Sequence, residues 1–173
     1  MVTRSTQPAL AAIKLAWWRE RLEELDDGRI PAEPRLESAA QQLLPRGISG
    51  TDLAGLEHGW ATCLQPTPDI PSVSEHGSLL FAIACRLIDV PFDEGIGDAG
   101  SLFAITQAAR RGLITLPSDM SAIASVMPKR ARPLTGLAAL AARDLRCAGR
   151  DFEPEATPGR SWILIRHRVT GRI

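Results

Sequence analysis

The sequence predicts an all-α protein that folds as a single domain over residues 1–173. In successive segments apolar residues recur at helical spacing, and Gly and Pro residues separate these segments. The chain is 45% hydrophobic and 23% charged, which is typical of a globular protein. With 173 residues it is long enough to bury one core without disulfides or metal ions. We therefore expect a helical bundle.

The first predicted helix runs from Pro8 to Asp27 and ends at Gly28, which favours the left-handed stop conformation. Its stripe consists of Leu15, Trp18, Leu22 and Leu25. Because adjacent residues point about 100° apart on a helix, Asp26 and Asp27 are interpreted as surface charges. A shorter helix is expected over residues 34–44.

Ser49 and Asp52 have the spacing of a capping box and predict the start of a third helix. The prolines within residues 65–74 predict a loop there, because they remove backbone donors. A fourth helix is expected to follow and to end before Pro91.

In the second half, Asp98 is expected to cap a fifth helix that ends at Arg110 and Arg111. Met120, Ile123 and Met127 suggest a short helix, and residues 133–145 predict another that ends at Gly149. Residues 162–169 fit a helix or a strand by pattern alone. We expect a helix there because the preceding segments are helical.

The charge balance gives no reason to expect nucleic-acid binding. The chain has twenty Lys and Arg residues and twenty Asp and Glu residues, so its formal net charge is zero, and its pI is about 6.8. No basic patch dominates before the last fifteen residues or so, where basic residues indicate a solvated tail or a surface for an acidic partner or lipid headgroups. These residues are Arg160, Arg166, His167, Arg168 and Arg172.

The three cysteines are odd in number and far apart, which argues against a disulfide framework or a zinc site and suits the reducing cytoplasm. The longest apolar run, residues 79–85, is too short for a transmembrane segment. His58, Cys63 and His76 are interpreted as a core cysteine and surface histidines, not as a nucleophile with its base. The four tryptophans fit core packing, with the lining of a ligand cavity as the alternative: Trp17, Trp18, Trp60 and Trp162.

Two motifs carry a resemblance to a known family. Residues 13–22 read IKLAWWRERL, with a double Trp followed by Arg and an acid. Ala99 and Gly100 begin a helix that ends in Arg110 and Arg111, and LITLPSD follows at residues 113–119. In order and spacing these motifs resemble the squalene and phytoene synthase family, over roughly residues 8–145.

The resemblance implies an all-helical isoprenoid synthase fold around a central cavity. Aspartate-rich motifs on facing helices of that fold hold Mg²⁺, which binds the diphosphates of prenyl substrates. On this resemblance we expect Trp18, Arg21 and Arg110 to line a ligand cavity.

The sequence departs from the family at its metal ligands. No acidic residue precedes Lys14, and a base, Arg111, follows Arg110 where the second motif needs an acid. Asp89 and Asp93 have the four-residue spacing, but Pro91 lies between them. We interpret this segment as a solvated acidic loop, with a Mg²⁺ site as the alternative.

These departures favour a non-catalytic relative without a cofactor, comparable to the family members that help to assemble respiratory complex I. It would hold a protein partner or an apolar prenyl ligand in the cytoplasm, and peripheral membrane contact is compatible with it. The alternatives are an active head-to-head prenyltransferase that uses Mg²⁺ and a structural interaction module without a cavity. Because the chain begins shortly before the double-Trp helix, we also expect further N-terminal helices in a longer protein.

Overall fold

The computed structural model describes residues 8–117, 120–121, 125–147 and 152–173, and these residues form seven α-helices with no strand. The all-α prediction is confirmed, and the last segment is a helix. The helices are α1 (Pro8–Glu23), α2 (Pro34–Gln42), α3 (Gly50–Thr62), α4 (Ile70–Leu87), α5 (Glu94–Arg110), α6 (Arg132–Arg146) and α7 (Pro158–Thr170).

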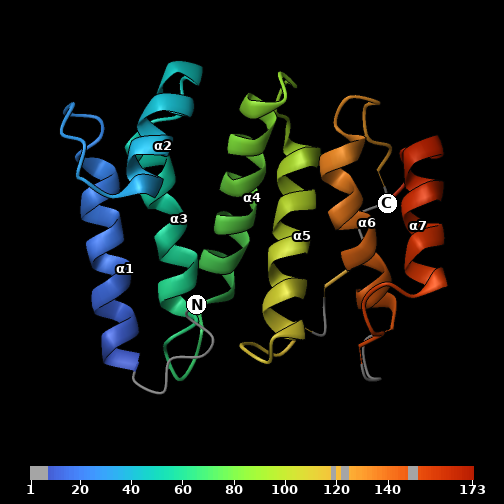
Figure 1. Cartoon of the computed structure of the whole chain (residues 1–173). Helices are drawn as coiled ribbons and strands as arrows, with labels where there is room; N and C mark the ends of the chain where they lie inside the picture. Colours follow the sequence, from blue (N-terminus) through green and yellow to red (C-terminus); the bar gives the residue numbers. More distant parts are fainter. Residues whose placement is uncertain (1–7, 118–119, 122–124, 148–151) are drawn as a thin grey trace.

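Helices α1, α3, α4, α5, α6 and α7 stand side by side in a row (Figure 1). α1 packs on α3, α3 on α4, α4 on α5, α5 on α6, and α6 on α7. α2 covers the end of α1, where its Leu36 and Ala40 pack with Leu25 and Trp18. α1 and α7 are therefore the outer helices of the row.

Glycines allow neighbouring helices to come close. A Cβ atom added to Gly77 on α4 would overlap the carbonyl oxygen of Gly100 on α5, and one added to Gly100 would overlap the carbonyl oxygen of Gly77. On α3, a Cβ at Gly59 would overlap the Cβ of His76 on α4. Only a residue without a side chain fits at these crossings.

The capping box is present in full. The Ser49 hydroxyl accepts a hydrogen bond from the Asp52 N–H at 2.9 Å, and an Asp52 carboxylate oxygen accepts one from the Ser49 N–H at 3.1 Å. The loop predicted over residues 65–74 is wrong in its second half, since α4 begins at Ile70. Pro71 lies in the first turn, where its missing N–H has no partner to lose.

Asp93, and not Asp98, caps α5. An Asp93 carboxylate oxygen accepts a hydrogen bond from the Ile96 N–H at 2.8 Å, and Asp98 lies inside the helix. The short helix expected around Met120 and Met127 is wrong for the described part of this segment. Met120 and Met127 are not helical, and Ile123 lies outside the described residues. The Met127 N–H donates instead to the carbonyl of Gly171 at 2.8 Å, so this segment pairs with the end of the chain.

Asp26 is not only a surface charge. Its carboxylate accepts hydrogen bonds from the Gly50 N–H at 2.5 Å and from the Thr51 N–H and hydroxyl at 2.8 Å each. It therefore satisfies donors at the start of α3. Burial raises the pKa of Asp26, but the hydrogen bonds from Gly50 and Thr51 outweigh it, so the pKa lies below its ordinary value of 3.8.

Replacing Asp26 with Ala should lower the free energy of unfolding by about 1 kcal/mol at pH 7, as loss of a helix cap does. Since the folded-state pKa is depressed, the contribution of the charge is present above pH 3.8 and is lost as the pH falls below it. Urea unfolding followed by circular dichroism should show a difference from wild type that shrinks towards pH 3. Asp27→Ala is the control, because the Asp27 side chain pairs with exposed Arg29 and with no other described residue. An equal loss in both variants would contradict the role of Asp26.

Candidate functional site

α7 presents an apolar face to solvent. Trp162, Ile165 and Val169 are 63%, 55% and 73% exposed. Their spacing of three and four residues places them on one side of the helix. Arg166 and Arg168, both exposed, lie on the two sides of this stripe. We refer to these five residues as the α7 outer face.

The opposite side of α7 is buried against α6 by residues that share the same spacing, Arg160, Ile163 and His167. The His167 Nδ1–H donates to the carbonyl of Arg172 at 3.0 Å, and its Nε2 lies 2.9 Å from the Thr135 hydroxyl on α6. Both ring nitrogens of this buried histidine therefore have partners. They fix the rotation of α7 about its axis, and so the direction of the outer face.

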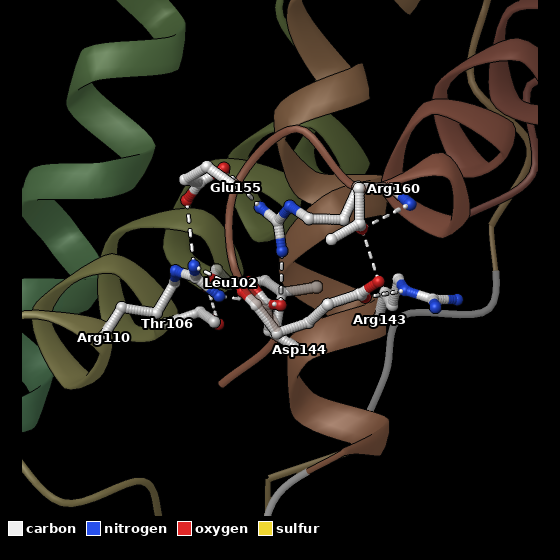
Figure 2. A network of polar contacts seen from close by, with 9 residues as sticks. Leu102, Thr106, Arg110, Arg143, Asp144, Glu155 and Arg160 are labelled. Atoms are coloured by element: carbon white, nitrogen blue, oxygen red, sulfur yellow. Dashed lines mark hydrogen bonds and ion pairs between the residues drawn. The ribbon is translucent and has the colours of Figure 1, made fainter. Parts of the chain in front are cut away.

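A buried ion network reinforces this attachment (Figure 2). Asp144 on α6 and Arg160 on α7 have side chains only 1% and 4% exposed, and an Arg160 Nη1–H donates to Asp144 Oδ1 at 2.6 Å. Arg110, at the end of α5, places its Nη1 3.1 Å from the same oxygen. One carboxylate oxygen thus joins three helices, and Asp144 Oδ2 has no hydrogen-bond partner among the described residues.

The segment before α7 completes the network. Glu155 pairs with Arg110 at 3.0 Å and with Arg160 at 3.3 Å. Glu153 accepts from Arg143 at 2.6 Å and from the Thr157 hydroxyl. The hydrogen bonds from Arg143 and Thr157 hold the pKa of Glu153 below its usual value.

A groove lies between α6 and the C-terminal residues, with a volume of about 570 Å³. Its lining includes Ile163, Thr170 and Ile173. Four arginines complete the lining, namely Arg143, Arg146, Arg166 and Arg172. Within the described part of the chain, no carboxylate lies within 4.0 Å of Arg146, Arg166 or Arg172. The groove and the α7 outer face share Arg166 and form one basic region.

The three residues expected to line a cavity lie in two places. Trp18 and Arg21 are on α1, where Trp18 packs against α2 and Arg21 pairs with Glu24 at 2.9 Å. Arg110 lies at the end of α5, in the network with Asp144. The structure does not bring Arg110 together with the other two.

Asp89 and Asp93 lie between α4 and α5, as expected for an acidic loop. Asp89 has a left-handed backbone with a φ of 52°, and Asp93 caps α5. Among the described residues, no group of three His, Cys, Asp or Glu is placed to hold a metal ion.

His58 and Cys63 do not face each other. His58 Nε2 lies 3.1 Å from the Ser72 hydroxyl, which donates a hydrogen bond to Asp69 Oδ2 at 2.5 Å. Because Ser72 donates to Asp69, His58 acts as the donor to Ser72 and not as its base. Burial raises the pKa of the Cys63 thiol, which keeps it protonated. His76 is half-buried and not on the surface.

Comparison of the chain with protein families, curated proteins and solved structures gave no match. Every helix in the described ranges is too short or too polar to cross a membrane. The site is therefore defined by its geometry alone.

Sequence reasoning missed how the basic C-terminal residues are divided. Arg160 and His167 are buried and paired, whereas Arg166 and Arg168 are exposed. The spacing of Arg160, Ile163 and His167 was the available signal, because residues three and four apart share a helix face. Part of the second family motif, Ser118 and Asp119, lies outside the described residues, as does Gly149.

Proposed function

We propose that the chain is a non-catalytic binding protein whose α7 outer face holds an acidic protein partner. The observation that carries this proposal is the exposed stripe of Trp162, Ile165 and Val169 on a helix whose other side is fixed by buried contacts. Helices dock into grooves through apolar residues at such spacing, and Trp and Arg are enriched at binding hot spots.

The charge of this region supports an acidic partner. Residues 158–173 contain no Asp or Glu, and three of their four arginines, Arg166, Arg168 and Arg172, are exposed, in a chain whose formal net charge is zero. Arginines beside an apolar stripe steer and orient a partner of opposite charge. The arginine-lined groove between α6 and the C-terminal residues extends the same surface.

Several residues that the squalene and phytoene synthase resemblance points to have structural roles here, which supports a non-catalytic relative. Asp93 accepts from the backbone of α5, and Arg110 pairs with Asp144 and Glu155. We also propose that the chain belongs to that family and has an isoprenoid synthase fold. The same proposal includes a role in assembling other proteins and a cytoplasmic location.

Site-specific cross-linking tests the partner surface. A photoreactive residue in place of Ile165 should cross-link one acidic protein in cells, and the yield should fall at least about tenfold when Arg166 and Arg168 become Glu. The same residue in place of exposed Glu75 on α4 is the control. Equal products at both positions, or a yield that the charge reversal leaves unchanged, would contradict the proposal. Binding to anionic but not neutral vesicles, without a protein product, would replace the partner with a membrane surface.

The prenyltransferase alternative has its own test. Purified protein with Mg²⁺ and radiolabelled farnesyl or geranylgeranyl diphosphate should release no pyrophosphate. Turnover would overturn the non-catalytic proposal, and Asp89 and Asp93 would then be the first carboxylates to replace.

A further inference from the structure

A second site lies away from α7, in a pocket of about 200 Å³ between α3, α4 and α5. Its lining is mainly apolar and aromatic and includes Trp60 from α3, His76 and Leu80 from α4, and Phe103, Gln107 and Arg111 from α5 and its C-cap. We call it the Trp60 pocket. It shares no residue with the α7 outer face.

The walls of the Trp60 pocket are fixed by packing. Trp60 and His76 meet edge to face, with ring centroids 5.4 Å apart. The backbone of Gly59 lies so close to His76 that a Cβ would not fit between them, so α3 and α4 have no room to shift together. On the other side Phe103 packs on buried Phe81, with centroids 5.9 Å apart. The pocket is therefore present before any ligand arrives.

A cation lies at one side of this apolar space. The Arg111 guanidinium is 5.3 Å from the centroid of the Trp60 ring, a cation–π arrangement that holds an exposed side chain beside the pocket. No carboxylate within the described ranges pairs with Arg111 at 4.0 Å or less. Its donors are thus available to an anion from outside, which a guanidinium can bind through two parallel hydrogen bonds.

His76 adds an acceptor. Its Nδ1–H donates to the carbonyl of Leu56 at 2.9 Å, so in the neutral ring Nε2 carries a lone pair. Burial lowers the pKa of His76, which favours the neutral ring near pH 7. The Gln107 amide, one turn before Arg111 on the α5 side, provides both a donor and an acceptor.

We propose that the Trp60 pocket binds a small aromatic carboxylate, with the ring between Trp60 and Phe103 and the carboxylate on Arg111. A dry cavity of about 150 Å³ accepts benzene, and drug-sized ligands occupy roughly 300–1,000 Å³. A volume of about 200 Å³ therefore suits one ring with a short acidic chain. A hydroxyl on the ring would find an acceptor in His76 Nε2.

Phenylacetate, 4-hydroxyphenylacetate and uncharged 2-phenylethanol are the probes, with binding measured by calorimetry and by amide shifts in ¹⁵N NMR. Wild-type protein should bind phenylacetate with a Kd on the order of 0.1 mM and shift the amides of Trp60, His76 and Phe103. It should bind 2-phenylethanol at least about tenfold more weakly.

Two arginine variants separate the site from general charge. Arg111→Gln should weaken phenylacetate binding about tenfold or more and leave 2-phenylethanol binding unchanged. Arg146→Gln, which removes an exposed arginine of the groove beside α7, should change neither. The proposal would be overturned if wild-type protein did not bind phenylacetate at a concentration about ten times the expected Kd. Equal binding of phenylacetate and 2-phenylethanol, or equal effects of the two arginine variants, would also overturn it. Unchanged circular dichroism of the variants confirms that binding is compared between folded proteins.

Discussion

Replacing Asp144 with Ala should lower the free energy of unfolding by about 3–5 kcal/mol, the usual result of breaking a buried ion pair. The Asp144 carboxylate pairs with Arg160 and Arg110, whose side chains are 4% and 12% exposed. Without it, two guanidinium groups stay in a poorly solvated place without their main counter-charge. Urea unfolding followed by circular dichroism would measure the loss.

Glu155→Gln is the matched control in the same network. Glu155 pairs with the same two arginines, but its side chain is 68% exposed. An exposed ion pair contributes about 0–1 kcal/mol, so this change should be nearly neutral. Equal losses in the free energy of unfolding for Glu155→Gln and Asp144→Ala would show that burial of an ion pair does not determine how much the pair contributes to stability.

A triple change separates the network from the packing around it. With Arg110→Met, Asp144→Leu and Arg160→Met together, no buried charge is left without a partner. This protein should be more stable than Asp144→Ala, because apolar residues of similar volume often replace buried ion pairs at little loss. A triple variant less stable than Asp144→Ala would contradict the account of unpaired charge.

The sequence was informative where structure depends on nearby residues. Helical spacing located the main helices, and the spacing of Ser49 and Asp52 identified a cap in which each residue bonds the backbone of the other. Gly28 has the left-handed backbone predicted for it, with a φ of 74°, although α1 itself ends at Glu23 and residues 24–28 form turns. These signals lie within four or five residues, so no knowledge of the packing is needed to find them.

Contacts between distant segments were beyond the sequence. Asp26 bonds the start of α3, 24 residues away, and Arg160 meets Asp144 across the contact of α7 with α6. The sequence therefore pointed to a tail of similar arginines, whereas the packing buries Arg160 and leaves Arg166 exposed. Trp60 was a candidate for a cavity, but the Trp60 pocket also needs Phe103 and Arg111, which only the contact of α4 with α5 brings near.

Gly77 and Gly100 show the same limit inside helices. A glycine within a helical pattern lowers helix stability by about 1 kcal/mol relative to Ala, and the sequence alone gives no reason for one at either position. The reason is the crossing of α4 and α5, where each glycine lies against the carbonyl oxygen of the other. This crossing lies beside the core residues Phe81, Ile96 and Ala99.

Gly100→Ala should therefore destabilise the protein although it favours the helix. The added Cβ would overlap the carbonyl of Gly77 and lie 2.9 Å from Cγ of Phe81. Relief requires α4 and α5 to move apart, and overpacking of a core costs about 1–3 kcal/mol, sometimes more. After the gain in helix propensity of about 1 kcal/mol, we expect a net loss of about 1–2 kcal/mol, or roughly 2–8 °C in Tm by calorimetry.

Gly95→Ala, in the same helix, is the control. Its added Cβ would lie 3.4 Å from Asp93 Oδ1, an ordinary contact, so stability should stay within about 0.5 kcal/mol of wild type. The double variant Gly77→Ala, Gly100→Ala provides a second check. Once one methyl group has separated the two helices, the other enters a gap that already exists, so the combined loss should be smaller than the sum of the single losses. Additive losses would mean that each glycine acts within its own helix and that the crossing does not set the distance between α4 and α5.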